Sequence, residues 1–227
     1  MSGASAMRTI GELIERNARF YPGKEALVCG GRRLSWSELA LRARRLASGL
    51  HRLGAQRQDR VAILAMNCPE YMELLAAGDW AGYIVATVNF RLAPPEIEWL
   101  LNDCTPRVLV FEAQYASVVD GLRAKLPHIT AYVCIGGPAP EWAREFEAVV
   151  AGGDAEGPPF RSQPDDYGPL VYTSGTTGRP KGVLVSHANV TRLFSSTQPW
   201  FQFNRNDVWT MFHSYAFDFS VWELWGA

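Results

Sequence analysis

Thr173-Ser174-Gly175-Thr176-Thr177-Gly178-Arg179-Pro180-Lys181-Gly182 is the stretch that organises the rest of this sequence, and it lies between two apolar runs that we predict to be β-strands. Glycine adopts positive φ angles without a Cβ clash, so Gly175 and Gly178 allow successive backbone N–H groups to point at one centre and form an anion-binding nest. The hydroxyl side chains add short donors, and Lys181 adds a positive charge. The stretch therefore predicts a loop that binds phosphate groups.

Other kinds of glycine-rich loop fit this stretch less well. A hairpin loop with solvated hydroxyls would explain an isolated Gly-Thr-Thr-Gly, but it does not require the lysine and the additional hydroxyls. A P-loop requires Gly-Lys followed by Ser or Thr at the start of a helix, whereas Lys181 follows Pro180 and precedes Gly182 and a strand-like run. The glycine spacing also differs from the Gly-x-Gly-x-x-Gly of a dinucleotide-binding turn.

Strand-like and helix-like segments alternate before this loop. Thr9-x-x-Glu12 is a capping box ahead of apolar residues at helical spacing, and Gly30-Gly31 joins two short strand-like runs, 26–29 and 33–36, as a hairpin. A helix is predicted from Ser37 to Leu53. The remaining predicted elements are strands at 61–66, 84–89, 108–111 and 129–135, and helices at 69–81, 95–102 and 115–126. Such alternation is typical of parallel strands with crossover helices, so we predict an α/β fold.

Composition divides the chain into four parts. We expect a disordered tail at 1–8, a first α/β subdomain at 9–151, a linker rich in glycine and proline at 152–168, and the start of a second subdomain, with the phosphate loop, at 169–227.

Charge, cysteine spacing and hydropathy restrict the class of protein. The chain has 227 residues, of which 48% are hydrophobic, and a net charge of −1, so it has material for a core and no basic field for nucleic acid. Its 4 cysteines are too far apart for a Cys-x-x-Cys pair, and no apolar run reaches the roughly 20 residues of a membrane-spanning helix. We expect a cytoplasmic protein with reduced thiols and no membrane insertion.

A second cluster of polar and aromatic residues follows a predicted strand at 208–212. His213 comes directly after this strand, and Ser220-x-x-Glu223 has the spacing of a capping box at a helix start. Asp218 lies between these features among aromatic residues, where a carboxylate is costly unless it is paired. Asp218 is therefore a candidate binding residue.

The stretch from Leu170 to Lys181 resembles, position for position, the signature of the adenylate-forming superfamily: acyl-CoA synthetases, luciferases and the adenylation domains of nonribosomal peptide synthetases. Residues 34–39 and 81–89 are similar to two earlier blocks of that superfamily, in the same order. The resemblance extends over nearly the whole chain from Thr9 onward. It implies part of the large N-terminal domain of the adenylate-forming fold, and ATP-dependent activation of a carboxylic acid as an acyl-adenylate.

The resemblance also implies roles for individual residues. The residues expected to hold the β- and γ-phosphates of ATP are Thr173, Ser174, Gly175, Thr176, Thr177, Gly178 and Lys181. The block around Asp218 resembles the fourth core motif of amino-acid-activating domains, in which the aspartate holds the substrate's α-ammonium. Phe219 and Trp222 would then line the side-chain pocket, and His213 would stand where the superfamily often has an aromatic or histidine gate. A structural role for Asp218 or His213 is the alternative in each case.

The implied cofactors and partners are ATP, Mg²⁺ with an unidentified protein ligand, and CoA or a phosphopantetheinyl carrier protein as thiol acceptor. The favoured substrate is an amino acid. A fatty or aryl acid–CoA ligase is the alternative, because Val88-Asn89-Phe90-Arg91-Leu92 is similar to stand-alone acyl-CoA synthetases. Compared with the superfamily, the chain lacks the later blocks, so we expect an N-terminal fragment with its catalytic lysine beyond Ala227. A non-catalytic nucleotide-binding or interaction module is the second alternative.

Overall fold

A seven-stranded sheet forms the centre of the computed structural model, which describes residues 9–173, 180–204, 207–217 and 220–225. The strand order is β7-β6-β5-β3-β4-β8-β9, and a separate two-stranded sheet pairs β1 with β2. All neighbouring strands of the large sheet are parallel except β8 and β9, which are antiparallel. The predicted α/β fold with parallel strands is confirmed. The predicted tail at 1–8 lies outside the described residues.

The N-terminal elements form as their local sequence signals predict. Helix α1 (Ile10–Phe20) begins with the Thr9–Glu12 capping box, and β1 (Glu25–Cys29) and β2 (Arg32–Ser35) form the hairpin. Helix α2 (Trp36–Arg52) begins one residue before the predicted start, because the side chain of Ser35 accepts a hydrogen bond from the Glu38 amide and caps the helix there.

The alternating region is also confirmed, with small shifts at the element ends. Its strands and helices are β3 (Arg60–Leu64), α3 (Pro69–Ala81), β4 (Ile84–Val88), α4 (Pro94–Cys104), β5 (Val108–Glu112), the 3₁₀ turn η1 (Ala113–Tyr115), α5 (Ala116–Arg123) and β6 (Ala131–Ile135). The short β7 (Arg144–Glu145) and α6 (Phe146–Gly152) follow, and no sequence signal had predicted them.

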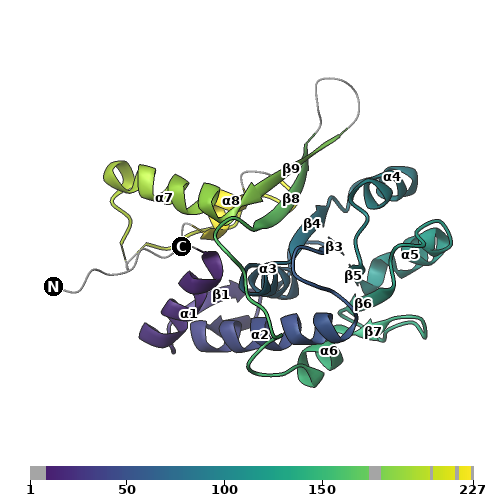
Figure 1. The fold of residues 1–227 in the computed structure, drawn as a ribbon, viewed down its shortest axis with the longest axis horizontal. Coiled ribbons are helices and arrows are strands. Elements are labelled where there is room, and N and C mark those ends of the chain that lie inside the picture. Colours follow the sequence, from purple (N-terminus) through teal and green to yellow (C-terminus); the bar gives the residue numbers. More distant parts are fainter. Residues whose placement is uncertain (1–8, 174–179, 205–206, 218–219, 226–227) are drawn as a thin grey trace.

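Alternate residues of the parallel strands point to opposite faces of the sheet, so each face has its own apolar core. Val61 and Ile63 of β3 pack with α1, α2, α3 and α6, whereas Ala62 and Leu64 pack with α4 and α5. Figure 1 shows α2 and α6 along one side of the sheet and α4 and α5 together at the other. The two layers of helices leave the carboxyl ends of the strands between them.

The last part of the chain extends the same sheet. Strand β8 (Tyr167–Thr173) lies beside β4, and β9 (Lys181–Ser186) returns antiparallel to β8 (Figure 1). Helix α7 (His187–Phe201) then begins with a capping box made by Ser186 and Asn189, and α8 (Ser220–Trp225) ends the described residues. The strands predicted on either side of the glycine-rich loop are confirmed.

The predicted strand at 208–212 is wrong. Residues 207–212 form no helix or strand, and the side chains of Val208 and Phe212 are 93% and 82% exposed. An apolar run becomes a strand only where a neighbouring backbone completes its ladder of hydrogen bonds. Among the described residues, no strand pairs with this segment.

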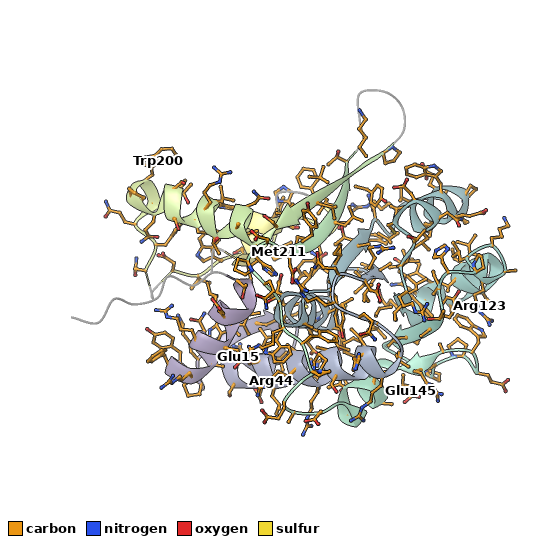
Figure 2. The ribbon with its side chains drawn as sticks, in the orientation of Figure 1. Glu15, Arg44, Arg123, Glu145, Trp200 and Met211 are labelled. Atoms are coloured by element: carbon orange, nitrogen blue, oxygen red, sulfur yellow. The ribbon has the colours of Figure 1, made fainter. Side chains whose placement is uncertain are left out.

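Ion pairs join neighbouring helices and connecting segments. Glu15 of α1 and Arg44 of α2 lie side by side in Figure 2, with 2.8 Å between carboxylate and guanidinium. Arg57 makes a bidentate contact with the buried Asp166, at 2.9 and 2.7 Å, and this contact fixes the end of the glycine- and proline-rich segment beside β8.

The four cysteines are free thiols. Among the described residues, no helix is long and apolar enough to cross a membrane.

Candidate functional site

A cavity of about 540 Å³ opens at the carboxyl ends of the adjacent parallel strands β4 and β8. Helix α4 and the segment 213–217 close its sides. The residues that line it are Thr87, Asn89, Arg91, Leu92, Leu100, Tyr172, Thr173, Pro180, His213, Ser214, Ala216 and Phe217. Ligands of open α/β sheets bind outside the carboxyl ends of the strands, so this is the place where the fold favours a binding site.

Two of the predicted phosphate-binding residues lie beside this cavity. Thr173 ends β8 and Lys181 begins β9, and the antiparallel register places them directly opposite each other. A hydroxyl and an ammonium group therefore stand at the two ends of the glycine-rich loop. Ser174, Gly175, Thr176, Thr177 and Gly178 lie outside the described residues.

The strand end that leads into the loop is held by Tyr172. Its hydroxyl donates a 2.6 Å hydrogen bond to the carboxylate of Asp103 in α4, and its ring packs edge-on against Trp99. Burial, followed by the hydrogen bond to Asp103, raises the pKa of the Tyr172 hydroxyl well above its usual range, so the group remains a donor. Opposite Tyr172 stands Gly182, where a Cβ would lie 3.3 Å from the tyrosine ring.

His213 lines the cavity, and Glu223 of α8 holds it. The Glu223 carboxylate accepts a 2.8 Å bond from the His213 Nδ1 and a 3.1 Å bond from its backbone N–H. Burial favours the neutral acid, but these bonds outweigh burial and lower the pKa of Glu223. The predicted Ser220–Glu223 capping box is therefore wrong: Ser220 is itself the first helical residue, and its hydroxyl donates to the Tyr215 carbonyl at 3.1 Å.

Asn67, which the sequence did not single out, clamps the same segment from the first part of the chain. Its side-chain amide donates to the His213 carbonyl at 2.8 Å and accepts from the Tyr215 amide at 3.1 Å. The rings of Tyr71 and Tyr215 stack at 4.6 Å beside this clamp. Asn67 lies just past the carboxyl end of β3. A polar residue at that position was the sequence signal that could have marked it as a site residue.

Trp222, the remaining described candidate, does not line the cavity. Its ring stacks on Phe194 of α7 at 5.2 Å and belongs to an aromatic cluster. The other members are Phe201, Phe203 and Trp209. Asp218 and Phe219 lie outside the described residues, so their roles stay predictions.

The described residues of the cavity wall carry little charge. Arg91 is the only permanently charged residue in the lining that the structure describes, and no carboxylate is part of that lining. A guanidinium suits an anionic group such as a carboxylate or a phosphate. Among the described residues, no three His, Cys, Asp or Glu side chains gather as a group that could hold a metal ion.

Comparison with known proteins identifies the family. The family model for AMP-binding enzymes matches residues 14–227. A dimodular nonribosomal peptide synthase of Bacillus subtilis (strain 168) is 35% identical over 95% of this chain, and a 3-methylmercaptopropionyl-CoA ligase of Ruegeria lacuscaerulensis is 36% identical over 78% of it. The chain spans only 9% and 35% of the length of these two relatives.

A solved structure agrees with this assignment. A protein from Rhodopseudomonas palustris CGA009, assigned as a long-chain fatty-acid CoA ligase, superposes with a TM-score of 0.87 at 31% identity. The match covers 96% of this chain and 55% of that one. The chain belongs to the family of AMP-binding enzymes.

Proposed function

We propose that this chain takes part in the ATP-dependent activation of an amino acid as its acyl-adenylate, before transfer to the thiol of CoA or of a phosphopantetheinyl carrier protein. The observation that carries the proposal is the opposed placement of Thr173 and Lys181 at the carboxyl end of β8, beside the cavity at the end of β4. This placement supports a phosphate site at the edge of the sheet where the cavity lies.

The proposed reaction forms one bond and breaks one. A carboxylate oxygen of the acid attacks the α-phosphorus of ATP, and the bond from that phosphorus to the β-phosphate oxygen breaks, so pyrophosphate leaves with the electron pair. Negative charge on the phosphate oxygens is stabilised by hydrogen-bond donors and cations, and we assign this role to the Thr173 hydroxyl, the Lys181 ammonium and the N–H groups that the sequence predicts for the loop between them. Mg²⁺, when bound to the phosphate oxygens, would neutralise part of the same charge.

The class of acid depends on Asp218. A carboxylate at that position would pair with the α-ammonium of an amino acid and would repel an acid that has no amine. The peptide synthase among the relatives agrees with an amino acid substrate. In the sequence, Asp218, Phe219 and Trp222 resemble the set that favours a small hydroxylated amino acid such as threonine, but in the structure Trp222 stacks on Phe194 and is not part of the cavity lining.

A fatty or aryl acid is the second candidate, and the cavity supplies the observation in its favour. Apolar side chains such as Leu92, Leu100 and Phe217 line it together with Arg91, and the described lining contains no carboxylate. The CoA ligase among the relatives agrees with this alternative. CoA would then be the thiol acceptor.

Binding and exchange measurements test the proposal. Titration calorimetry of the 227-residue chain with ATP and Mg²⁺ should detect binding, and Lys181→Ala should weaken it by roughly 10-fold or more, since a hydrogen bond to a charged group contributes about 1.5–3 kcal/mol. Lys125→Ala is the matched control, because Lys125 is an exposed lysine paired with Glu98. Equal affinity in both variants would exclude a phosphate contact by Lys181.

The acid is identified by pyrophosphate exchange with a panel of amino, fatty and aryl acids, on the protein as its gene encodes it. Exchange that depends on an amino acid and is lost in Asp218→Ala supports the proposal. Exchange that depends on an acid without an amine favours the CoA-ligase alternative. ATP binding without exchange for any acid favours a non-catalytic nucleotide-binding module.

A further inference from the structure

Asn89 follows the last residue of β4 and lines the cavity at the carboxyl end of that strand. The chain turns at this point. The Leu92 amide donates to the Asn89 carbonyl at 3.1 Å, and the Arg91 amide donates to the Asn89 side chain at 3.0 Å. An asparagine that bonds to the backbone two residues ahead is a common start of a turn, and this bond holds the Asn89 side chain in one orientation.

The bond from Arg91 also fixes which way the Asn89 amide faces. A backbone N–H can only donate, so the side-chain atom that it meets is Oδ1, and Nδ2 lies on the other branch of the amide. In the described part of the chain, Nδ2 has no hydrogen-bond partner. The turn needs only an acceptor, which a serine or an aspartate would also supply. The turn therefore leaves the two N–H donors of Nδ2 unexplained.

The strand register places Asn89 next to the start of the glycine-rich loop. Thr87 of β4 pairs with Val171 of the parallel strand β8. Asn89 and Thr173, each two residues further along, therefore occupy corresponding positions on the same face of the sheet. Both residues line the cavity. Neighbouring strands lie about 4.8 Å apart, a separation that a single phosphate group can bridge with its oxygens.

The charge around Asn89 favours an anionic ligand. The Arg91 guanidinium is part of the same lining, and no carboxylate belongs to the lining that the structure describes. A carboxylate and a phosphate would both suit such a wall. The phosphate is favoured because Thr173, the neighbour of Asn89 across the strands, begins the predicted phosphate loop.

We propose that Asn89 is a further ATP-binding residue, whose Nδ2 group donates a hydrogen bond to a phosphate oxygen beside the Thr173 hydroxyl. The proposal rests on the proposed function for the identity of the nucleotide. Because Oδ1 remains bonded to the Arg91 amide, the donor is held in place before ATP binds. Little side-chain entropy is then lost on binding.

Titration calorimetry with ATP and Mg²⁺, on the protein as its gene encodes it, tests the proposal through Asn89→Asp. The aspartate keeps an acceptor for the Arg91 amide, and with it the turn, but replaces the Nδ2 donors with a negative oxygen. The affinity for ATP should fall by about 10-fold or more, as expected for the loss of a hydrogen bond to a charged group. Gln114→Glu is the matched control, because it makes the same change at an exposed residue outside the described lining.

The outcomes separate this proposal from the proposed function. Equal affinity for ATP in Asn89→Asp and in the wild type overturns the role of Asn89, and if Lys181→Ala still weakens binding, the proposed function stands. If Asn89→Asp raises only the concentration of acid needed for pyrophosphate exchange, the amide serves the acid and the proposal is overturned. Failure of the wild type to bind ATP overturns both.

Nuclear magnetic resonance of the wild type with ¹⁵N-labelled asparagine supplies a readout that needs no substitution. Saturating ATP with Mg²⁺ should shift the side-chain amide signals of Asn89. Those of Asn102, whose amide bonds to the Glu98 carbonyl within α4, should stay unchanged. Unshifted Asn89 signals would overturn the proposal, even if Asn89→Asp failed to fold.

Discussion

Asn67→Ala should release the segment 213–217 from the edge of the sheet without unfolding the protein. The substitution removes the bond to the His213 carbonyl at 2.8 Å and the bond to the Tyr215 amide at 3.1 Å. Through these two bonds, Asn67 in the β3–α3 connection holds the segment 213–217. Among the described residues, this segment pairs with no strand. The stacked Tyr71–Tyr215 pair remains as an apolar contact.

The expected cost follows from these two bonds. Each neutral hydrogen bond contributes about 0.5–1.5 kcal/mol, and because Asn67 is exposed and water can replace it, we expect a total of about 1–2 kcal/mol. A change of that size in a local opening equilibrium increases the open population by about 5–30-fold. At about 2–4 °C per kcal/mol for a chain of this size, the melting temperature should fall by about 2–8 °C.

Hydrogen exchange at individual amides measures the effect. The Tyr215 amide loses its acceptor directly, so the informative amides are those of His213 and Phe217, which bond to Glu223 and to the Ser214 carbonyl. Both should exchange faster in Asn67→Ala and be unchanged in Asn102→Ala, a control whose side chain bonds to Glu98 within α4. If the exchange rate increases at the Tyr215 amide only, Asn67 does not hold the segment and our reasoning is refuted.

Three further predictions concern stability. Tyr172→Phe should lower the free energy of unfolding by about 1 kcal/mol in urea, because it removes the bond to Asp103; an unchanged value would mean that water replaces the bond fully. Gly157→Ala should lower the free energy of unfolding by about 2–5 kcal/mol in the same assay, because Gly157 has a φ of +83° and a Cβ would collide with the Trp80 ring. A decrease of less than about 1 kcal/mol would contradict this expectation. Burial lowers the pKa of His187 below its usual value of 6.5. As the pH falls, the His187 side chain therefore stays neutral in the native protein while the same side chain of the unfolded chain takes up a proton. Stability should therefore decline as the pH falls below about 6.5, and this slope should weaken in His187→Gln; melting curves with the same slope in both proteins would be evidence against it.

The helices and strands of the first part of the chain could be predicted because their signals are local. The capping box at Thr9 lies directly at the start of its helix, and the apolar runs of β3 to β6 carry their own strand signal. Prediction failed at residues 208–212, because an apolar run does not reveal whether a neighbouring backbone will pair with it. It failed for α6 because the helix is short and lacks a side-chain cap.

The candidate site was predicted in part for the same reason. Thr173 and Lys181 belong to one contiguous stretch, so their placement at facing ends of two strands follows from local sequence. Ser220 and Glu223 also match a local motif, yet Glu223 bonds to His213, ten positions away, in place of the helix start. The spacing of a capping box shows that the two side chains could bond to the helix start. The packing around the helix determines which hydrogen-bond partner each side chain has in the folded protein.

The sequence by itself determined the order and type of most elements, the α/β class and the glycine-rich stretch, because periodicity, caps and turn residues act over a few positions. Only the tertiary structure decided which distant residues meet around the cavity. Asn67 reaches His213 across 146 positions, and Tyr172 reaches Asp103 across 69. Both contacts depend on the strand order and the crossover handedness, which bring segments that are far apart in the sequence next to one another and which no local pattern encodes.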